Sequence, residues 1–122
     1  IGLDVTTTVQ LDDGRFASLR KIPGLASGIF GASMERYMAA CRKYIGESPA
    51  MHDPCCVAYV ANPEIFTTKK YHVGVELAGT LTRGRTVVDT TGVTGLAPNA
   101  SVAITVDVER FWAMLAEELG RY

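Results

Sequence analysis

A histidine and an aspartate stand side by side at His52-Asp53, directly before a run of apolar residues. Histidine is the side chain that most readily gives or takes a proton near neutral pH, and a carboxylate is a preferred ligand for a hard cation such as calcium. Asp53-Pro54 predicts a helix start, because aspartate is a favoured N-cap and proline fits the first helical position. The pair therefore indicates proton transfer or metal binding where a helix begins.

The same pair also has a purely structural interpretation. Aspartate before proline commonly serves only as a helix cap, and a lone histidine beside it is commonly a surface or hydrogen-bonded residue. The segment Cys55–Ala61 carries no charge, which predicts a helix that is buried all round. We therefore expect His52 and Asp53 to lie where a buried helix meets a cavity or the surface.

The overall composition indicates one domain, or part of one, that is nearly neutral. The chain has 122 residues, with 12 Lys and Arg against 13 Asp and Glu. Binding to nucleic acid needs a basic stripe, so no nucleic-acid partner is expected. No apolar stretch approaches the roughly 20 residues of a membrane span. Three cysteines without a CxxC spacing predict small core residues in a reducing, cytoplasmic compartment; they are Cys41, Cys55 and Cys56.

The periodicity predicts helices in the first half of the chain and strands in the second. The elements expected in the first half are a strand end at 1–5, a short helix after Asp12-Asp13, a helix at 33–44 capped by Ser33, and the buried helix at 54–61. Alternation of apolar and polar residues predicts strands at 71–77, 80–82, 85–89 and 102–106, which form an antiparallel segment with one wet face. Asp107 is expected to cap a final helix whose apolar stripe contains Phe111, Met114, Leu115 and Leu119.

Four segments carry motifs in a fixed order along nearly the whole chain. They are Gly2-Leu3-Asp4-Val5-Thr6, His52-Asp53-Pro54-Cys55-Cys56-Val57-Ala58-Tyr59-Val60, Pro63-Glu64-Ile65-Phe66-Thr67-Thr68 and the segment 75–89. Together they resemble the inosine-uridine-type nucleoside hydrolases. The resemblance implies hydrolysis of the N-glycosidic bond of a ribonucleoside to ribose and a free base. It also implies an open α/β sheet fold whose site lies at the carboxyl ends of the strands.

The resemblance assigns chemical roles to four residues. His52 matches the family's leaving-group proton donor, and Asp53 matches a calcium ligand. Breaking a ribosyl C–N bond builds positive charge on the sugar, and a protonated base leaves more easily, which suits a histidine general acid. A bound metal ion can activate the attacking water. Tyr37 and Cys41, four residues apart on one helix face, are candidates to contact the nucleobase, although both equally fit a core position.

The resemblance further implies that residues 1–122 form the C-terminal portion of a nucleoside hydrolase domain. The family's N-terminal aspartate cluster, which holds most of the calcium ion, has no counterpart here. The adjacent acid pairs, Asp12-Asp13 and Glu117-Glu118, both fall in solvated helices. Because one carboxylate cannot hold calcium, the N-terminal part of the same domain is an expected partner. The family is commonly oligomeric, so a homo-oligomer is the expected assembly.

Two other functions stay open at this point. A metal phosphohydrolase of the His-Asp type needs several more histidine ligands, but His72 is the only other histidine and is expected to be exposed on a strand. A non-catalytic module derived from a hydrolase, which binds a partner or a nucleoside, fits a chain that holds only part of a site. The isolated chain is accordingly expected to be inactive on nucleosides.

Overall fold

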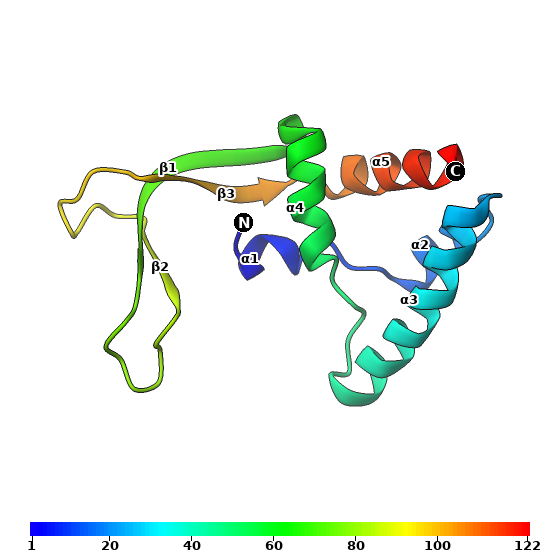
Figure 1. Ribbon diagram of the computed structural model, residues 1–122, viewed down its shortest axis with the longest axis horizontal. Helices are drawn as coiled ribbons and strands as arrows, with labels where there is room; N and C mark the ends of the chain where they lie inside the picture. Colours follow the sequence, from blue (N-terminus) through cyan, green and yellow to red (C-terminus); the bar gives the residue numbers. More distant parts are fainter.

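The computed structural model describes residues 1–122 as an elongated chain of helices and one sheet. Figure 1 shows the sheet at one end, α2, α3 and α5 at the other, and α1 with α4 between them. None of these helices is long and apolar enough to cross a membrane. The elements are α1 Leu3–Thr6, α2 Asp13–Leu19, α3 Leu25–Tyr44, α4 His52–Ala61, the 3-10 turn η1 Pro63–Ile65, β1 Phe66–Val75, β2 Thr86–Asp89, β3 Ala100–Val106 and α5 Val108–Arg121.

The three strands form an antiparallel sheet in the order β2-β1-β3, as the alternation predicts. The long central strand β1 pairs first with β3, from Phe66 opposite Val106 to Tyr71 opposite Ala100. Its second half pairs with β2, where His72 lies opposite Asp89. The prediction of a strand at 80–82 is wrong, because this segment forms a turn. The carboxylate of Glu76 stabilises that turn by accepting hydrogen bonds from the backbone N–H groups of residues 78 and 79, at 2.7 and 3.0 Å.

The first residues form a short helix instead of the expected strand end. The Gly2 carbonyl accepts hydrogen bonds from the N–H groups of Val5 and Thr6, both at 3.2 Å. The hydroxyl of Thr7 donates to the Leu3 carbonyl at 2.7 Å. Threonine hydroxyls that bond a carbonyl one turn back compete with strand pairing, so a sequence rich in β-branched residues can still turn here. The short helix buries Val5 and Thr6.

Helix α3 begins eight residues earlier than expected, and Ser33 lies inside it instead of capping it. The residue before the helix is Gly24, whose φ of 131° suits glycine and few other residues. A Cβ on Gly24 would lie 3.1 Å from the carbonyl carbon of Tyr122, so a larger residue would separate α3 from the end of α5. The backbone N–H of Leu25 donates to the carbonyl of Tyr122 at 3.1 Å. Gly24 therefore allows the close approach, and the small residues Ala26, Ser27 and Gly28 in the first turn weaken the apolar pattern of the sequence.

Helix α4 is only half buried, which contradicts the expectation of a helix buried all round. Cys55 and Ala58 pack into the core, whereas the side chains of Val57 and Val60 are 70% and 84% exposed. The N-cap is Met51, and Asp53 lies in the first turn of the helix instead of capping it. Cys56 is exposed, so the prediction that all three cysteines are core residues is wrong for this one.

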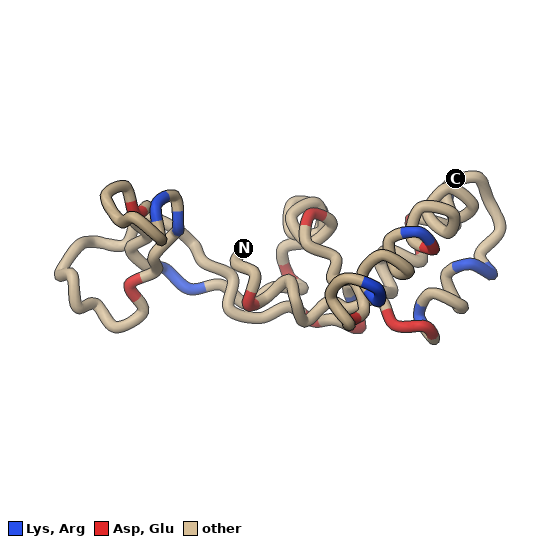
Figure 2. Tube along the Cα trace, turned by 90° about the horizontal axis from the view of Figure 1, so that it is seen from below, with Lys and Arg blue, Asp and Glu red and all other residues tan.

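Helix α5 agrees with its predicted cap and stripe. The Asp107 carboxylate accepts a hydrogen bond from the N–H of Arg110 at 3.0 Å. Phe111 and Leu119 are buried, and Met114 and Leu115 are half-buried against the same core. The charged residues of the helix are exposed, and Figure 2 shows that basic and acidic residues both occur along the whole chain.

Candidate functional site

His52 lies at the first position of α4 and is held by a threonine from α1. Its ring nitrogen Nδ1 is 2.7 Å from Oγ1 of Thr6, although the two residues are 46 positions apart in sequence. Thr6 is 4% exposed, so this contact is shielded from water on the threonine side. His52 is half-buried. Thr6 lies within the recognised motif at 2–6, but its contact with His52 depends on the tertiary fold and was not predicted.

A pocket of about 200 Å³ brings His52 together with Tyr37 and Cys41 from α3. These are three of the four residues singled out from the sequence. Two backbone hydrogen bonds hold the segment between α3 and α4 against residues 9–11. The N–H of Leu11 donates to the Pro49 carbonyl and the N–H of Met51 donates to the Val9 carbonyl, both at 2.9 Å. The remaining lining residues come from two short stretches and are Thr7, Gln10, Ile45, Glu47, Ser48, Pro49 and Ala50.

The Tyr37 hydroxyl stays protonated in this pocket. Partial burial raises the pKa of Tyr37, and the neighbouring Cys41 thiol and the negative charge of Asp53 raise it further. Cys41 is buried, at 4% exposure. The pocket thus contains a neutral phenol and a thiol beside an imidazole, which is a set of hydrogen-bonding groups suited to the nitrogen and oxygen atoms of a heterocycle.

Asp53 lines a different pocket from His52. Its neighbours there are mainly apolar side chains of α4 and α5, and the cavity has a volume of about 440 Å³. No group of three or more His, Cys, Asp and Glu side chains is placed to hold a metal ion. Calcium takes six to eight oxygen ligands, so this chain alone does not form a calcium site. Asp53 is a single exposed carboxylate that other ligands would have to complete.

The two acid pairs bind arginines. The Asp12 carboxylate contacts Arg15 at 2.6 Å, and Asp13 pairs with Arg42. Glu117 and Glu118 both contact the guanidinium of Arg121, at 2.6 and 2.8 Å. These acids therefore neutralise neighbouring basic side chains on the surface and do not approach His52 in the pocket.

His72 belongs to another part of the molecule. It is half-buried and not fully exposed as expected, and its Nδ1 lies 3.0 Å from the Ala97 carbonyl in a contact that is open to solvent. It lines a hollow on the sheet and not the pocket of His52. The structure therefore supplies no second histidine to His52, and the cluster of ligands that a His-Asp phosphohydrolase needs is not formed.

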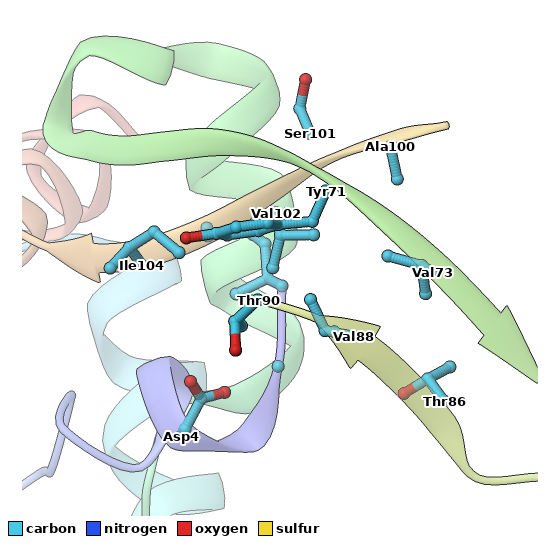
Figure 3. A pocket seen from close by; sticks show the side chains of 13 residues that line it. Asp4, Tyr71, Val73, Thr86, Val88, Thr90, Ala100, Ser101, Val102 and Ile104 are labelled. Carbon is cyan, nitrogen blue, oxygen red and sulfur yellow. The ribbon is translucent and has the colours of Figure 1, made fainter. Parts of the chain in front are cut away.

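A further hollow of about 320 Å³ lies between α1 and the sheet. Figure 3 shows Val88, Val102 and Ile104 beside the Tyr71 ring in this hollow, with the Asp4 carboxylate below them. The lining is largely apolar, and it includes Gly2 and Asp4 of the first motif but none of the four candidate site residues, Tyr37, Cys41, His52 and Asp53.

Comparison with known proteins decides the family. The family model described as inosine-uridine preferring nucleoside hydrolase matches residues 1–113. The chain belongs to this family. The match confirms the family resemblance that the sequence motifs indicate.

Curated relatives of this nucleoside hydrolase chain include enzymes from enteric bacteria. The chain is 38% identical over 123 residues to the pyrimidine-specific ribonucleoside hydrolase RihA of Klebsiella pneumoniae strain 342, which covers 99% of the chain and 40% of that protein. It is 39% identical to the enzyme of the same description from Salmonella typhimurium, with the same coverage. The chain thus spans about 40% of the length of these relatives.

Solved nucleoside hydrolase structures share the fold. The purine-preferring ribonucleoside hydrolase from Gardnerella vaginalis superposes with a TM-score of 0.82 at 28% identity, covering 98% of the chain and 38% of that structure. The inosine-guanosine nucleoside hydrolase gives a TM-score of 0.81 at 25% identity, covering 98% and 37%. The mixed fold of helices, an antiparallel sheet and a C-terminal helix therefore corresponds to part of a nucleoside hydrolase.

Proposed function

We propose that this chain forms the leaving-group side of a ribonucleoside hydrolase active site, with His52 as the proton donor to the base. The observation that carries the proposal is the shared pocket of His52, Tyr37 and Cys41. The three residues come from two helices, and family membership supplies the reaction class. A pocket of this polarity offers a base both a proton donor and hydrogen-bonding partners.

The proposed reaction breaks the bond between C1′ of ribose and a ring nitrogen of the base. The bonding electron pair goes to the base, which receives a proton from the imidazole of His52. The oxygen of a water molecule bonds to C1′ and releases a proton to the solvent, which replaces the proton that His52 gave to the base. A correctly placed general acid contributes typically about 10²–10⁴-fold to such a rate. Tyr37 and Cys41 would contact the base and hold it against the imidazole.

We further propose that residues 1–122 are the C-terminal portion of a longer hydrolase domain. The coverage of about 40% of the relatives and the lone Asp53 carboxylate support this assignment. Asp53 would then be one ligand of a calcium ion whose other ligands lie on the remainder of the domain. Val57 and Val60 expose apolar side chains on α4, which supports the proposal that the remainder of the domain covers this surface. Homo-oligomeric assembly and a cytoplasmic location stay predictions from the sequence.

The test is release of ribose by the full-length protein that contains these residues. Both pyrimidine and purine ribonucleosides belong in the assay, because the relatives are named for one class and the solved structures for the other. His52→Ala is expected to lower kcat by at least about a hundredfold while KM changes little, since a proton donor acts in the transition state. The matched control is His72→Ala, which is expected to keep the wild-type kcat.

Two outcomes would reject the proposal. Equal losses in kcat/KM and binding affinity after His52→Ala would assign the residue to substrate binding and not to proton donation. No ribose release from any nucleoside by the wild-type full-length protein would favour the non-catalytic module.

A further inference from the structure

We infer that Thr6 is a positioning residue, which holds Nδ1 of His52 so that Nε2 is the nitrogen that gives its proton to the departing base. The inference rests on the proposed function, because it concerns how His52 performs its role as the acid. The residues that carry it are Thr6 in α1, His52 in α4 and Leu3, whose carbonyl is the other neighbour of the Thr6 hydroxyl.

The contact with His52 is the principal hydrogen bond of the Thr6 hydroxyl. Its distance to Nδ1 is 2.7 Å, whereas its distance to the Leu3 carbonyl is 3.5 Å. That carbonyl already accepts hydrogen bonds from the N–H and the hydroxyl of Thr7, at 2.9 and 2.7 Å. Thr6 is buried, and buried polar groups keep a partner. The threonine hydroxyl is therefore committed to the imidazole.

A hydroxyl group can serve Nδ1 in either protonation state. It donates its hydrogen when Nδ1 carries a lone pair, and it accepts when Nδ1 carries a hydrogen. When Nδ1 carries a hydrogen, that N–H donates to the Thr6 oxygen. When the Nε2–H bond breaks, a new N–H bond forms on the base, and the contact between Nδ1 and Thr6 persists. The ring therefore keeps its orientation through the proton transfer.

The backbone of Thr6 is fixed by a hydrogen bond, and its hydroxyl differs in partner from those of the next two threonines. The backbone N–H of Thr6 donates to the Gly2 carbonyl at 3.2 Å, and the neighbouring Val5 is buried in the core. The two following threonines have different partners, because the hydroxyls of Thr7 and Thr8 donate to the carbonyls of Leu3 and Val5. Thr6 is thus the member of the Thr6–Thr8 run that reaches the imidazole, and Thr8, which lies outside the His52 pocket, offers a matched control.

The experiment compares Thr6→Val, Thr6→Ala and Thr6→Ser with Thr8→Val in the full-length protein. Ribose release gives kcat and KM, and ¹⁵N NMR of the histidine ring reports how the proton is shared between Nδ1 and Nε2. A His72→Gln background leaves His52 as the one labelled histidine of residues 1–122. Thr6→Ala is included because it adds no bulk, so it reports on the hydroxyl if Thr6→Val does not fold.

Loss of the hydroxyl is expected to lower kcat about tenfold with KM within about twofold, because one buried hydrogen bond is lost. The ¹⁵N resonances of His52 should move in the same variants, Thr6→Ser should restore both readouts, and Thr8→Val should change neither. Unchanged ¹⁵N resonances in Thr6→Val or Thr6→Ala would overturn the inference, whatever happens to kcat. Retention of wild-type kcat by His52→Ala would instead reject the proposed function, while the NMR result would still report on the contact.

Discussion

Asp53 follows His52 in the first turn of α4, but the two side chains line different pockets. Successive residues of an α-helix point roughly 100° apart, so neighbours in sequence face different surroundings. His52 lies beside Tyr37, whereas Asp53 lies over the cavity between α4 and α5. The charge of Asp53 still reaches the His52 pocket, because it contributes to the raised pKa of Tyr37 after burial and Cys41. One turn of helix thus connects the proposed proton donor, His52, with a carboxylate that lines a different cavity.

Replacing the Asp53 carboxylate tests its proposed role as a calcium ligand. Asp53→Asn in the full-length protein is expected to weaken calcium binding roughly tenfold, because one charged oxygen ligand becomes neutral. Elemental analysis after dialysis measures the calcium content. The control is Glu118→Gln, which removes a carboxylate that lines the same cavity and should leave the calcium content unchanged. Wild-type calcium in Asp53→Asn would exclude Asp53 from the metal site.

Tyr37 provides a test of base binding that is separate from proton transfer. Tyr37→Phe removes the phenolic hydroxyl from the His52 pocket, and KM is expected to rise roughly fivefold from the loss of one hydrogen bond. The value of kcat should stay within about twofold, because the contact is made before and during the reaction. Tyr44→Phe is the control, since Tyr44 lies on the same helix but is 76% exposed. Tyr37 is 41% exposed, which contradicts the core alternative for this residue, so an unchanged KM for every nucleoside would leave it as an exposed side chain of α3 without a role in base binding.

The second half of the fold was more predictable from sequence than the first. Alternation along β1 and the capping aspartate before α5 are local signals, so the strands and the last helix could be recognised from short windows. The start of α3 depends on Gly24, which allows the helix to approach the distant Tyr122. The exposed face of α4 also lacks a local signal, because an uncharged segment does not reveal what covers it.

The candidate site was predictable to the same limited extent. The motif predicts His52, and the family resemblance predicts Tyr37 and Cys41, supported by helical spacing that places residues four apart on one face. Their common pocket follows from the backbone pairing of the segments 9–11 and 49–51. The sequence does not predict the contact of Thr6 with His52, because only the packing of α1 against α4 brings the threonine hydroxyl to the imidazole. Contacts between distant segments leave no periodic pattern.

The loop after β2 should respond to acid through Asp89. The pKa of Asp89 falls from the usual 3.8 to about 2, first because the Thr94 hydroxyl donates to its carboxylate, and then because the N–H groups of Thr94 and Val93 donate as well. These contacts measure 2.6, 2.9 and 3.0 Å. A folded-state pKa below the unfolded one stabilises the loop above about pH 4, and this contribution is lost as the pH falls toward about 2.

Titration by NMR measures this effect directly. The amide resonances of Val93 and Thr94 should move with a midpoint near pH 2, the value to which the pKa of Asp89 is lowered. Asp89→Asn should abolish this transition, because the remaining amide has no titrating proton. Thr94→Val should raise the midpoint, since it removes the hydroxyl that lowers the pKa most. A midpoint near the usual 3.8 in the unaltered protein would show that the carboxylate is free.

The adjacent cysteines of α4 should react at very different rates. Cys55 is fully buried, and this burial, together with Cys56, raises the pKa of its thiol from 9.0 to about 11. Cys56 is exposed. The thiolate is the reactive form, so Cys55 should carry about a hundredfold less thiolate than an ordinary cysteine, and burial should slow it further. Treatment with iodoacetamide near neutral pH, followed by fragmentation mass spectrometry, should place the label on Cys56.

The control for this labelling is Cys56→Ser in the same chain. Labelling of the 55–56 pair should then nearly disappear, because the remaining thiol is Cys55. Fast labelling of Cys55 in this variant would show that α4 opens readily and that its buried side is not protected. In the full-length protein, slower labelling of Cys56 than in residues 1–122 alone is expected if the remainder of the domain covers the exposed side of α4. Equal rates in the two forms would show that this side faces solvent in both.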